Sequence, residues 1–159
     1  MMYPESRGFT LLELMIVVSI VAVIASLAGP SFSTLISSRQ ADLASARLKQ
    51  DLIFARNSAK TEGQNVAVAP VSDEFENGWT VTGVSDGRTL RQAGALGAGV
   101  NVTSGTTAAA PIIFSGISGG VIGGAGDVLQ VRSAGCSGDS DADITILPSG
   151  QIFVTDVGC

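Results

Sequence analysis

Arg7-Gly8-Phe9-Thr10-Leu11-Leu12-Glu13-Leu14 joins a short polar leader, residues 1–8, to an apolar run that continues to about Ala28. From Leu11 the run is 18 residues long, and Phe9 and Thr10 extend it to the ~20 residues that a membrane-spanning helix needs. Glu13 is its only charged residue. A carboxylate near the middle of a membrane costs roughly 2.5–3.5 kcal/mol, and less near the surface. The stretch therefore predicts a transmembrane helix over residues 9–29 whose carboxylate has a function and a partner.

A glycine before Phe9, a glutamate four residues after it and an uninterrupted apolar helix resemble the class III signal of type IV pilins and type II secretion pseudopilins. The resemblance implies that a prepilin peptidase cleaves between Gly8 and Phe9 and that Phe9 is then N-methylated. It also implies that Glu13 of an incoming subunit meets the Phe9 amine of a neighbour, because pairing offsets the cost of a buried carboxylate. The alternative is an uncleaved signal anchor with Glu13 at the membrane surface.

The apolar run ends at Gly29-Pro30, where proline removes a backbone donor and clashes with the preceding turn. Either the helix ends here, or it kinks at Pro30 and continues. We expect a kinked continuation over residues 30–63, because apolar residues return at helical spacing and Gly63 is a plausible stop. The residues expected on its buried side are Phe32, Leu35, Ile36, Leu43, Ala46, Leu52, Ile53 and Ala59.

Beyond Gly63 the apolar residues alternate with polar ones, which is typical of half-buried strands, and Pro148-Ser149-Gly150 predicts the last turn. Residues 64–159 are therefore expected to form an antiparallel β domain packed on the second half of the long N-terminal helix, an α+β fold. Trp79 is expected in its core, and the glycine-rich segment Ser115–Gly126 as a flexible surface hairpin. The expected strands are Asn65–Pro70, Gly78–Val84, Arg88–Gln92, Gly99–Thr103, Pro111–Ser115, Asp127–Arg132, Ala142–Leu147 and Gln151–Thr155.

Four segments resemble the H-type minor pseudopilins of type II secretion (GspH) and the related FimU- and FimT-type minor pilins. They are Leu52–Ala59, Gly78-Trp79-Thr80-Val81, Ile112–Phe114 with Gly116 after it, and the final Ser149-Gly150 hairpin that ends at a cysteine. The resemblance implies a pilin-like fold and a structural subunit that helps start or cap a periplasmic filament. It implies other major and minor pilin-like subunits, the prepilin peptidase and the inner-membrane assembly platform as partners.

The net charge of the chain is −5, and after Pro30 eight basic residues stand against twelve acidic ones, which gives −4. An acidic domain argues against general attraction to nucleic acid or to anionic membranes. We therefore do not expect nucleic acid as a partner. We also expect no small-molecule substrate and no cofactor. The expected location is the bacterial inner membrane, crossed once, with the domain in the periplasm, and the filament after assembly.

Cys136 and Cys159 are the two cysteines, and histidine is absent. Two cysteines without histidine do not make an ordinary structural zinc site. In an oxidising periplasm such a pair usually forms a disulfide, which we expect here. Closing that loop would stabilise the fold by about 3 kcal/mol in the loop-entropy account.

The sequence shows no catalytic constellation, since it lacks a histidine base and a nucleophile elbow. Asp139, Asp141 and Asp143 alternate at a spacing that could offer oxygens to Ca²⁺. An EF-hand loop, however, needs glycine where this chain has Ile144. We expect a solvated acidic turn and no metal.

Two further functions compete with the structural subunit. The first is a DNA-binding minor pilin for natural transformation, a role that T-type members of the resembled group can have. Those members carry basic residues around the last hairpin, whereas this chain has Gln151 there and no Lys or Arg beyond Arg132. The second is a membrane-anchored enzyme. The sequence does not distinguish a type II secretion system from a type IV pilus or a competence machine.

Overall fold

The computed structural model describes residues 9–104, 111–123, 128–135 and 141–158. The chain divides into two compact units, Met1–Ser33 and Thr34–Cys159. The helix α1, Leu11–Glu62, contributes its first turns to one unit and its last turns to the other.

In the first unit α1 carries the apolar run. The side chains of residues 9–26 are exposed: Phe9, just before the helix, is 84 % exposed, and Leu11 is 77 % exposed. Residues 29 and 30 are both helical, so the helix does not end at Gly29-Pro30. A kink at Pro30 stays a prediction. No helix in the described part of the chain is long and apolar enough to cross a membrane.

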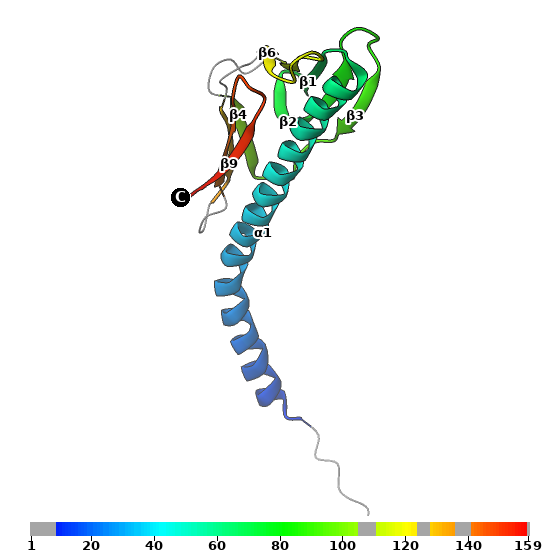
Figure 1. The fold of residues 1–159 in the computed structure, drawn as a ribbon. Helices are drawn as coiled ribbons and strands as arrows, with labels where there is room; N and C mark the ends of the chain where they lie inside the picture. Colours follow the sequence, from blue (N-terminus) through cyan, green and yellow to red (C-terminus); the bar gives the residue numbers. More distant parts are fainter. Residues whose placement is uncertain (1–8, 105–110, 124–127, 136–140, 159) are drawn as a thin grey trace, which may run out of the picture. The chain divides into compact units, whose positions relative to one another are not determined.

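The second unit consists of two antiparallel sheets and the second part of α1 (Figure 1). Sheet A has the order β3-β2-β1-β5-β6, and sheet B has the order β4-β7-β8-β9. The strands of sheet A are β1 Val66–Val71, β2 Glu74–Gly83, β3 Thr89–Ala93, β5 Ile112–Phe114 and β6 Val121–Gly123. Those of sheet B are β4 Val100–Ser104, β7 Val128–Ser133, β8 Asp141–Ile146 and β9 Ile152–Val157. The expected α+β fold, a helix packed on antiparallel strands, is confirmed.

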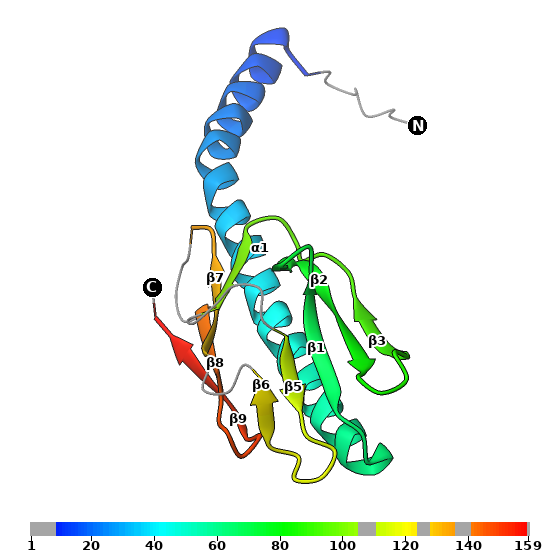
Figure 2. The ribbon, with the colours of Figure 1, turned by 90° about the horizontal axis from the view of Figure 1, so that it is seen from above.

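The core lies where α1 packs against both sheets (Figure 2), and the helix contributes mainly small side chains to it. The helix residues in the core are Ala41, Ala44, Leu48, Leu52, Ala55 and Ala59. Their spacing of three and four residues defines one face of a helix. Trp79 is fully buried, as expected.

The expected buried stripe of α1 is right for Leu52 and Ala59 and wrong for five other residues, while the side chain of Phe32 lies outside the described part of the chain. Small side chains allow the helix backbone to approach two sheets at once, and this outweighs the larger area that a leucine or isoleucine would bury. The larger residues are turned outward as a result. The expected core residues that are exposed instead are Leu35, Ile36, Leu43, Ala46 and Ile53.

The eight expected strands all occur, most with ends shifted by one or two residues, and β2 begins four residues earlier than expected. The expectation of a flexible surface hairpin over Ser115–Gly126 is wrong for part of the segment. Residues 121–123 form β6, which pairs with β5, and Val121 is buried. The Val121 N–H donates to the Pro148 carbonyl at 3.0 Å, so the turn between β8 and β9 holds the start of β6.

α1 ends at Glu62, and Gly63 follows with a φ of 65°, the left-handed conformation that often terminates a helix. The helix end contacts the turn between β2 and β3. There Arg88 lies 3.0 Å from Glu62 and also pairs with Asp86 at 3.7 Å. The backbone N–H of Arg88 donates to Asp86, and this bond, with one from Gln64, lowers the pKa of the Asp86 carboxyl.

Candidate functional site

Thr10 and Glu13 form a reciprocal cap at the start of α1. The Thr10 backbone N–H and hydroxyl donate to Glu13 Oε2 at 3.0 and 2.9 Å. The Glu13 backbone N–H donates to Thr10 Oγ1 at 3.2 Å. This arrangement is a capping box, in which a threonine and a glutamate three residues later satisfy free donors at a helix start. Glu13 therefore has a partner within its own chain.

The capping box also fixes where the Glu13 carboxylate lies relative to the expected processing site. The carboxylate accepts a hydrogen bond from the amide that joins Phe9 to Thr10, so it is held at the residue next to Phe9. Phe9 itself is exposed. Gly8 lies outside the described residues.

Asp51 is a buried carboxylate on α1. It accepts a hydrogen bond from Trp79 Nε1 in β2 at 2.9 Å and one from Arg91 in β3 at 2.8 Å. The Arg91 guanidinium also lies over the Phe54 ring, 4.0 Å from its centroid. A buried carboxylate is tolerated when it is paired and hydrogen-bonded. Asp51 thus fixes α1 against sheet A.

Arg56 joins α1 to two turns that are far apart in the sequence. Its Nε donates to the Gly119 carbonyl at 3.2 Å, in the turn between β5 and β6. Its NH2 group donates to the Ser149 carbonyl at 3.4 Å, in the turn between β8 and β9. Because β6 belongs to sheet A and β9 to sheet B, one guanidinium connects the helix to both sheets.

Glycines stand where other backbone comes too close for a side chain. Gly150 has a φ of 79°, and a Cβ there would lie 2.1 Å from the Gly119 carbonyl oxygen. A Cβ at Gly78, with a φ of 100°, would lie 2.2 Å from the Ala93 carbonyl oxygen. At Gly116 it would lie 2.5 Å from the Gln64 nitrogen. Contacts under 3.0 Å force the backbone to move. These are glycines of the segments that carry the resemblance to minor pseudopilins, and here their role is structural.

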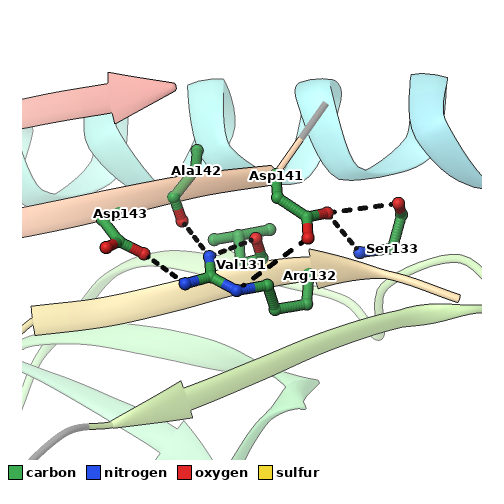
Figure 3. A network of polar contacts seen from close by, with 6 residues as sticks. All are labelled: Val131, Arg132, Ser133, Asp141, Ala142 and Asp143. Carbon is green, nitrogen blue, oxygen red and sulfur yellow. Dashed lines mark hydrogen bonds and ion pairs between the residues drawn. The ribbon is translucent and has the colours of Figure 1, made fainter. Parts of the chain in front are cut away.

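Asp141 and Asp143, two of the three candidate calcium ligands, lie on one side of β8 and face Arg132 of β7 (Figure 3). Arg132 lies 2.6 Å from Asp143 and 3.9 Å from Asp141, and it also donates to the Ala142 carbonyl at 3.2 Å. The Ser133 N–H and hydroxyl donate to Asp141. Both carboxylates therefore lie in a strand and pair with Arg132, so the expectation of a solvated acidic turn is wrong for these two residues. Asp139 lies outside the described residues, and no cluster of metal-ligating side chains occurs within them.

Cys136 and Cys159 both lie outside the described residues. The strands that precede them, β7 and β9, are separated in sheet B by β8. The expected disulfide remains a prediction.

Three functional contacts differ in the signal that the sequence gives for them. Thr10-Leu11-Leu12-Glu13 is the threonine-x-x-glutamate pattern of a capping box, so the contact between Thr10 and Glu13 has a local signal in the sequence. Arg56 is an arginine within an apolar segment, which suggests a partner for its charge. The pairing of Asp51 with Trp79 has no local signal, because it joins residues 28 positions apart.

Two known protein families match segments of this chain. The family described as "Type II transport protein GspH" matches residues 44–150, and the "Prokaryotic N-terminal methylation motif" matches residues 4–29. No match is found among curated protein sequences.

The fold is similar to two crystal structures of the type IV minor pilin FimU from Pseudomonas aeruginosa strain PAO1. The structure in space group P65 has a TM-score of 0.61 and 15% identity, and covers 73% of this chain and 94% of FimU. The structure in space group P21 has a TM-score of 0.60 and 12% identity, and covers 82% of this chain and 95% of FimU. With more than half of its length matched by the family and a pilin-like fold, this chain belongs to the GspH family of type II transport proteins.

Proposed function

We propose that this chain is a minor pilin-like subunit that helps to start or cap a periplasmic filament of a type II secretion system or a type IV pilus. Membership in a family of structural pilin-like proteins supports a structural role in a pilus or pseudopilus. The N-terminal methylation motif supports interactions with a prepilin peptidase and with other pilin subunits. The assembly platform of the inner membrane is the further partner that this role requires.

The observation that carries the proposal is the position of Glu13. The capping box holds its carboxylate beside Phe9, at the residue that cleavage after Gly8 would turn into a methylated, positively charged N-terminus. In a free subunit Thr10 is the partner of this carboxylate. In a filament the Phe9 amine of a neighbour adds an opposite charge, which lowers the cost of burying the carboxylate between helices.

The exposed apolar side chains support the proposed location. The large apolar side chains of α1 between Leu11 and Ile24 are all at least half exposed. We propose that this segment lies in the inner membrane as a single pass before assembly and in the filament core afterwards, with the second unit in the periplasm. In that compartment Cys136 and Cys159 would be oxidised to a disulfide. The second unit has exposed apolar side chains of its own on α1, Leu35, Ile36 and Leu43, which neighbouring subunits would cover.

Two variants of Glu13 test the proposal. Glu13→Ala removes both the cap and the charge, whereas Glu13→Gln keeps a hydrogen-bond acceptor for Thr10 and removes only the charge. We expect both variants to insert into the membrane and to be cleaved normally, and both to lose co-purification with other pilin-like subunits. The measurements are membrane abundance, the mass of the mature N-terminus, which should be N-methylated Phe9, and recovery with the partner subunits.

Thr10→Ala is the matched control, because it weakens the cap and leaves the carboxylate in place. We expect it to assemble close to the wild-type level. Normal assembly of Glu13→Gln would show that pairing of charges is not what recruits this subunit. A mature protein that retains the leader would contradict the proposal as a whole.

A further inference from the structure

The two sheets have four edge strands, and three of them are guarded against pairing with another chain. β6 has only three residues and an irregular register with β5, and β3 carries Arg91 and an irregular register with β2. In β4 the Val102 N–H donates to Glu76 Oε1 at 3.2 Å, so a side chain of β2 already occupies that edge. Short length, irregular register, charge and cover are the usual means by which proteins block sheet edges.

β9 lacks these guards. It has six residues, and it pairs with β8 in unbroken register from Ile146↔Ile152 to Asp141↔Val157. Asp156, near the end, is its only charged residue. Figure 2 shows β9 at the margin of sheet B, beyond β8.

The hydrogen-bond pattern identifies which groups of β9 are free. The Leu147 N–H donates to the Gln151 carbonyl, which makes these two residues a hydrogen-bonded pair next to the turn. Hydrogen-bonded and non-hydrogen-bonded pairs alternate along an antiparallel ladder. The backbone N–H and C=O groups of Phe153 and Thr155 therefore point toward β8. Val154 and Asp156 therefore direct their N–H and C=O groups away from β8, to the open edge.

A groove of about 340 Å³ runs between this strand and α1. It is lined by Ile53 and Arg56 of the helix and by residues 150–153 of the last hairpin. Ile53 and Phe153 are large apolar side chains that are 40% and 51% exposed. An added strand would bury both.

The helix side of the groove is basic. Lys49 lies one turn before Ile53, and Lys60 lies one turn after Arg56, so the three cations share one face of α1. Within the described ranges of the chain, no carboxylate forms an ion pair with Lys49, Arg56 or Lys60. This local positive charge stands out in a chain whose net charge is −5.

We propose that β9 is a docking edge that binds an extended, acidic segment of another protein as an added strand. The open N–H and C=O groups of β9 would pair with the segment's backbone, as in other cases of strand addition. Its carboxylates would face Lys49, Arg56 and Lys60. A nucleic acid backbone fits less well, because phosphates offer only acceptors and would leave the carbonyls of β9 unpaired, while Asp156 would repel them.

The test uses the full-length chain in detergent and a fluorescent, N-acetylated octapeptide of alternating valine and glutamate. The same peptide with lysine in place of glutamate is the control probe. We expect the acidic peptide to bind roughly tenfold more tightly than the basic one, because of the charge of the groove. Hydrogen exchange should show new protection of the Val154 and Asp156 amides, which point to the open edge, when the acidic peptide is bound.

Val154→Pro removes an outward N–H while leaving the bonds to β8 in place, and it should abolish the protection. Val154→Ala keeps that N–H and should still bind. Asp156→Pro tests the same point at an exposed residue, should Val154→Pro fail to fold. Lys60→Glu should weaken binding several-fold, whereas Arg39→Glu, which changes a cation that pairs with Asp42 elsewhere on α1, should not.

Equal binding of the two peptides, protection away from β9, or full binding by both proline variants would overturn the proposal. So would competition at these amides by a DNA oligonucleotide that binds more tightly than the acidic peptide. Because the probe is a synthetic peptide and no other subunit is present, such a result would leave the proposed role in a filament untouched.

Discussion

Glu13 and Asp51 are two carboxylates on the same helix with different kinds of partner. Glu13 bonds to Thr10, three residues before it, and these contacts are local and exposed. Asp51 is buried and bonds to Trp79 and Arg91, which are 28 and 40 residues away. The first contact forms wherever the first turn of α1 forms, whereas the second requires the β domain to be in place.

The difference shows how one helix can serve two purposes. A contact that depends only on neighbouring residues can be exchanged for an intermolecular one without disturbing the fold. A buried contact between distant residues cannot, because breaking it leaves a desolvated donor or charge behind. We therefore expect changes at distant contacts to lower the free energy of unfolding, and changes at Glu13 to leave that free energy almost unchanged.

The largest loss of stability is expected for Gly150→Ala. The left-handed backbone and the close approach of the Gly119 carbonyl both oppose a Cβ, and together they should cost about 3 kcal/mol or more. Gly87→Ala is the matched control, since Gly87 also has a positive φ but a Cβ there would have no atom within 4 Å. It should cost only the strain, about 1 kcal/mol. Denaturant unfolding followed by the fluorescence of Trp79, the single tryptophan, measures both. Equal losses would show that the contact between the two turns contributes nothing.

Asp51→Ala comes next, with an expected loss of about 2–3 kcal/mol. It leaves Trp79 Nε1 buried without an acceptor and removes the ion pair with Arg91. Asp51→Asn keeps an acceptor for Trp79 and should lose roughly half as much, because Arg91 is partly exposed and its pairing is screened by solvent. Denaturant unfolding measures both losses. If Asp51→Ala lowers the free energy of unfolding no more than Glu13→Ala does, the two carboxylates do not differ in their contribution to stability.

Thr10→Ala should have the smallest effect on stability. Loss of a helix cap costs about 1 kcal/mol, but the cost falls on the first turn of α1. Unfolding of the second unit should therefore be unchanged, while hydrogen exchange of the first amides of α1 should become faster. A shift in the unfolding midpoint of the β domain would mean that the two ends of the helix are energetically coupled.

Local patterns in the sequence predict the strands and the helix well, because alternation and helical spacing depend on nearby residues. Gly63 ends the helix as expected, and Trp79 is in the core. The buried face of α1 is predicted poorly, because hydrophobicity favours Leu43 and Ile53 over Ala44 and Ala55. Which residues are buried depends on how closely two sheets approach the helix, and the sequence of the helix alone does not determine that distance.

The residues of the candidate site also differ in whether a local sequence pattern or a contact between distant residues identifies them. The proposed processing junction and Glu13 are recognisable from residues 7–14 alone, and Thr10 could have been found from the capping-box pattern. Arg56 could be identified as a residue of interest within its segment, but not by its partners. Its contacts with Gly119 and Ser149 are 63 and 93 residues away, and they exist only after both turns have been brought together.

The position of Arg56 has a mechanical consequence. In the proposed filament, neighbouring subunits would hold α1, so a pull on the filament would reach this subunit first at the helix. Arg56 would pass part of that force to both sheets at once, because it bonds to a turn of each. Hydrogen bonds loaded in parallel break together, whereas hydrogen bonds loaded in series break one after another at a lower force. The two turns would therefore connect both sheets to the helix at the same point when α1 is pulled.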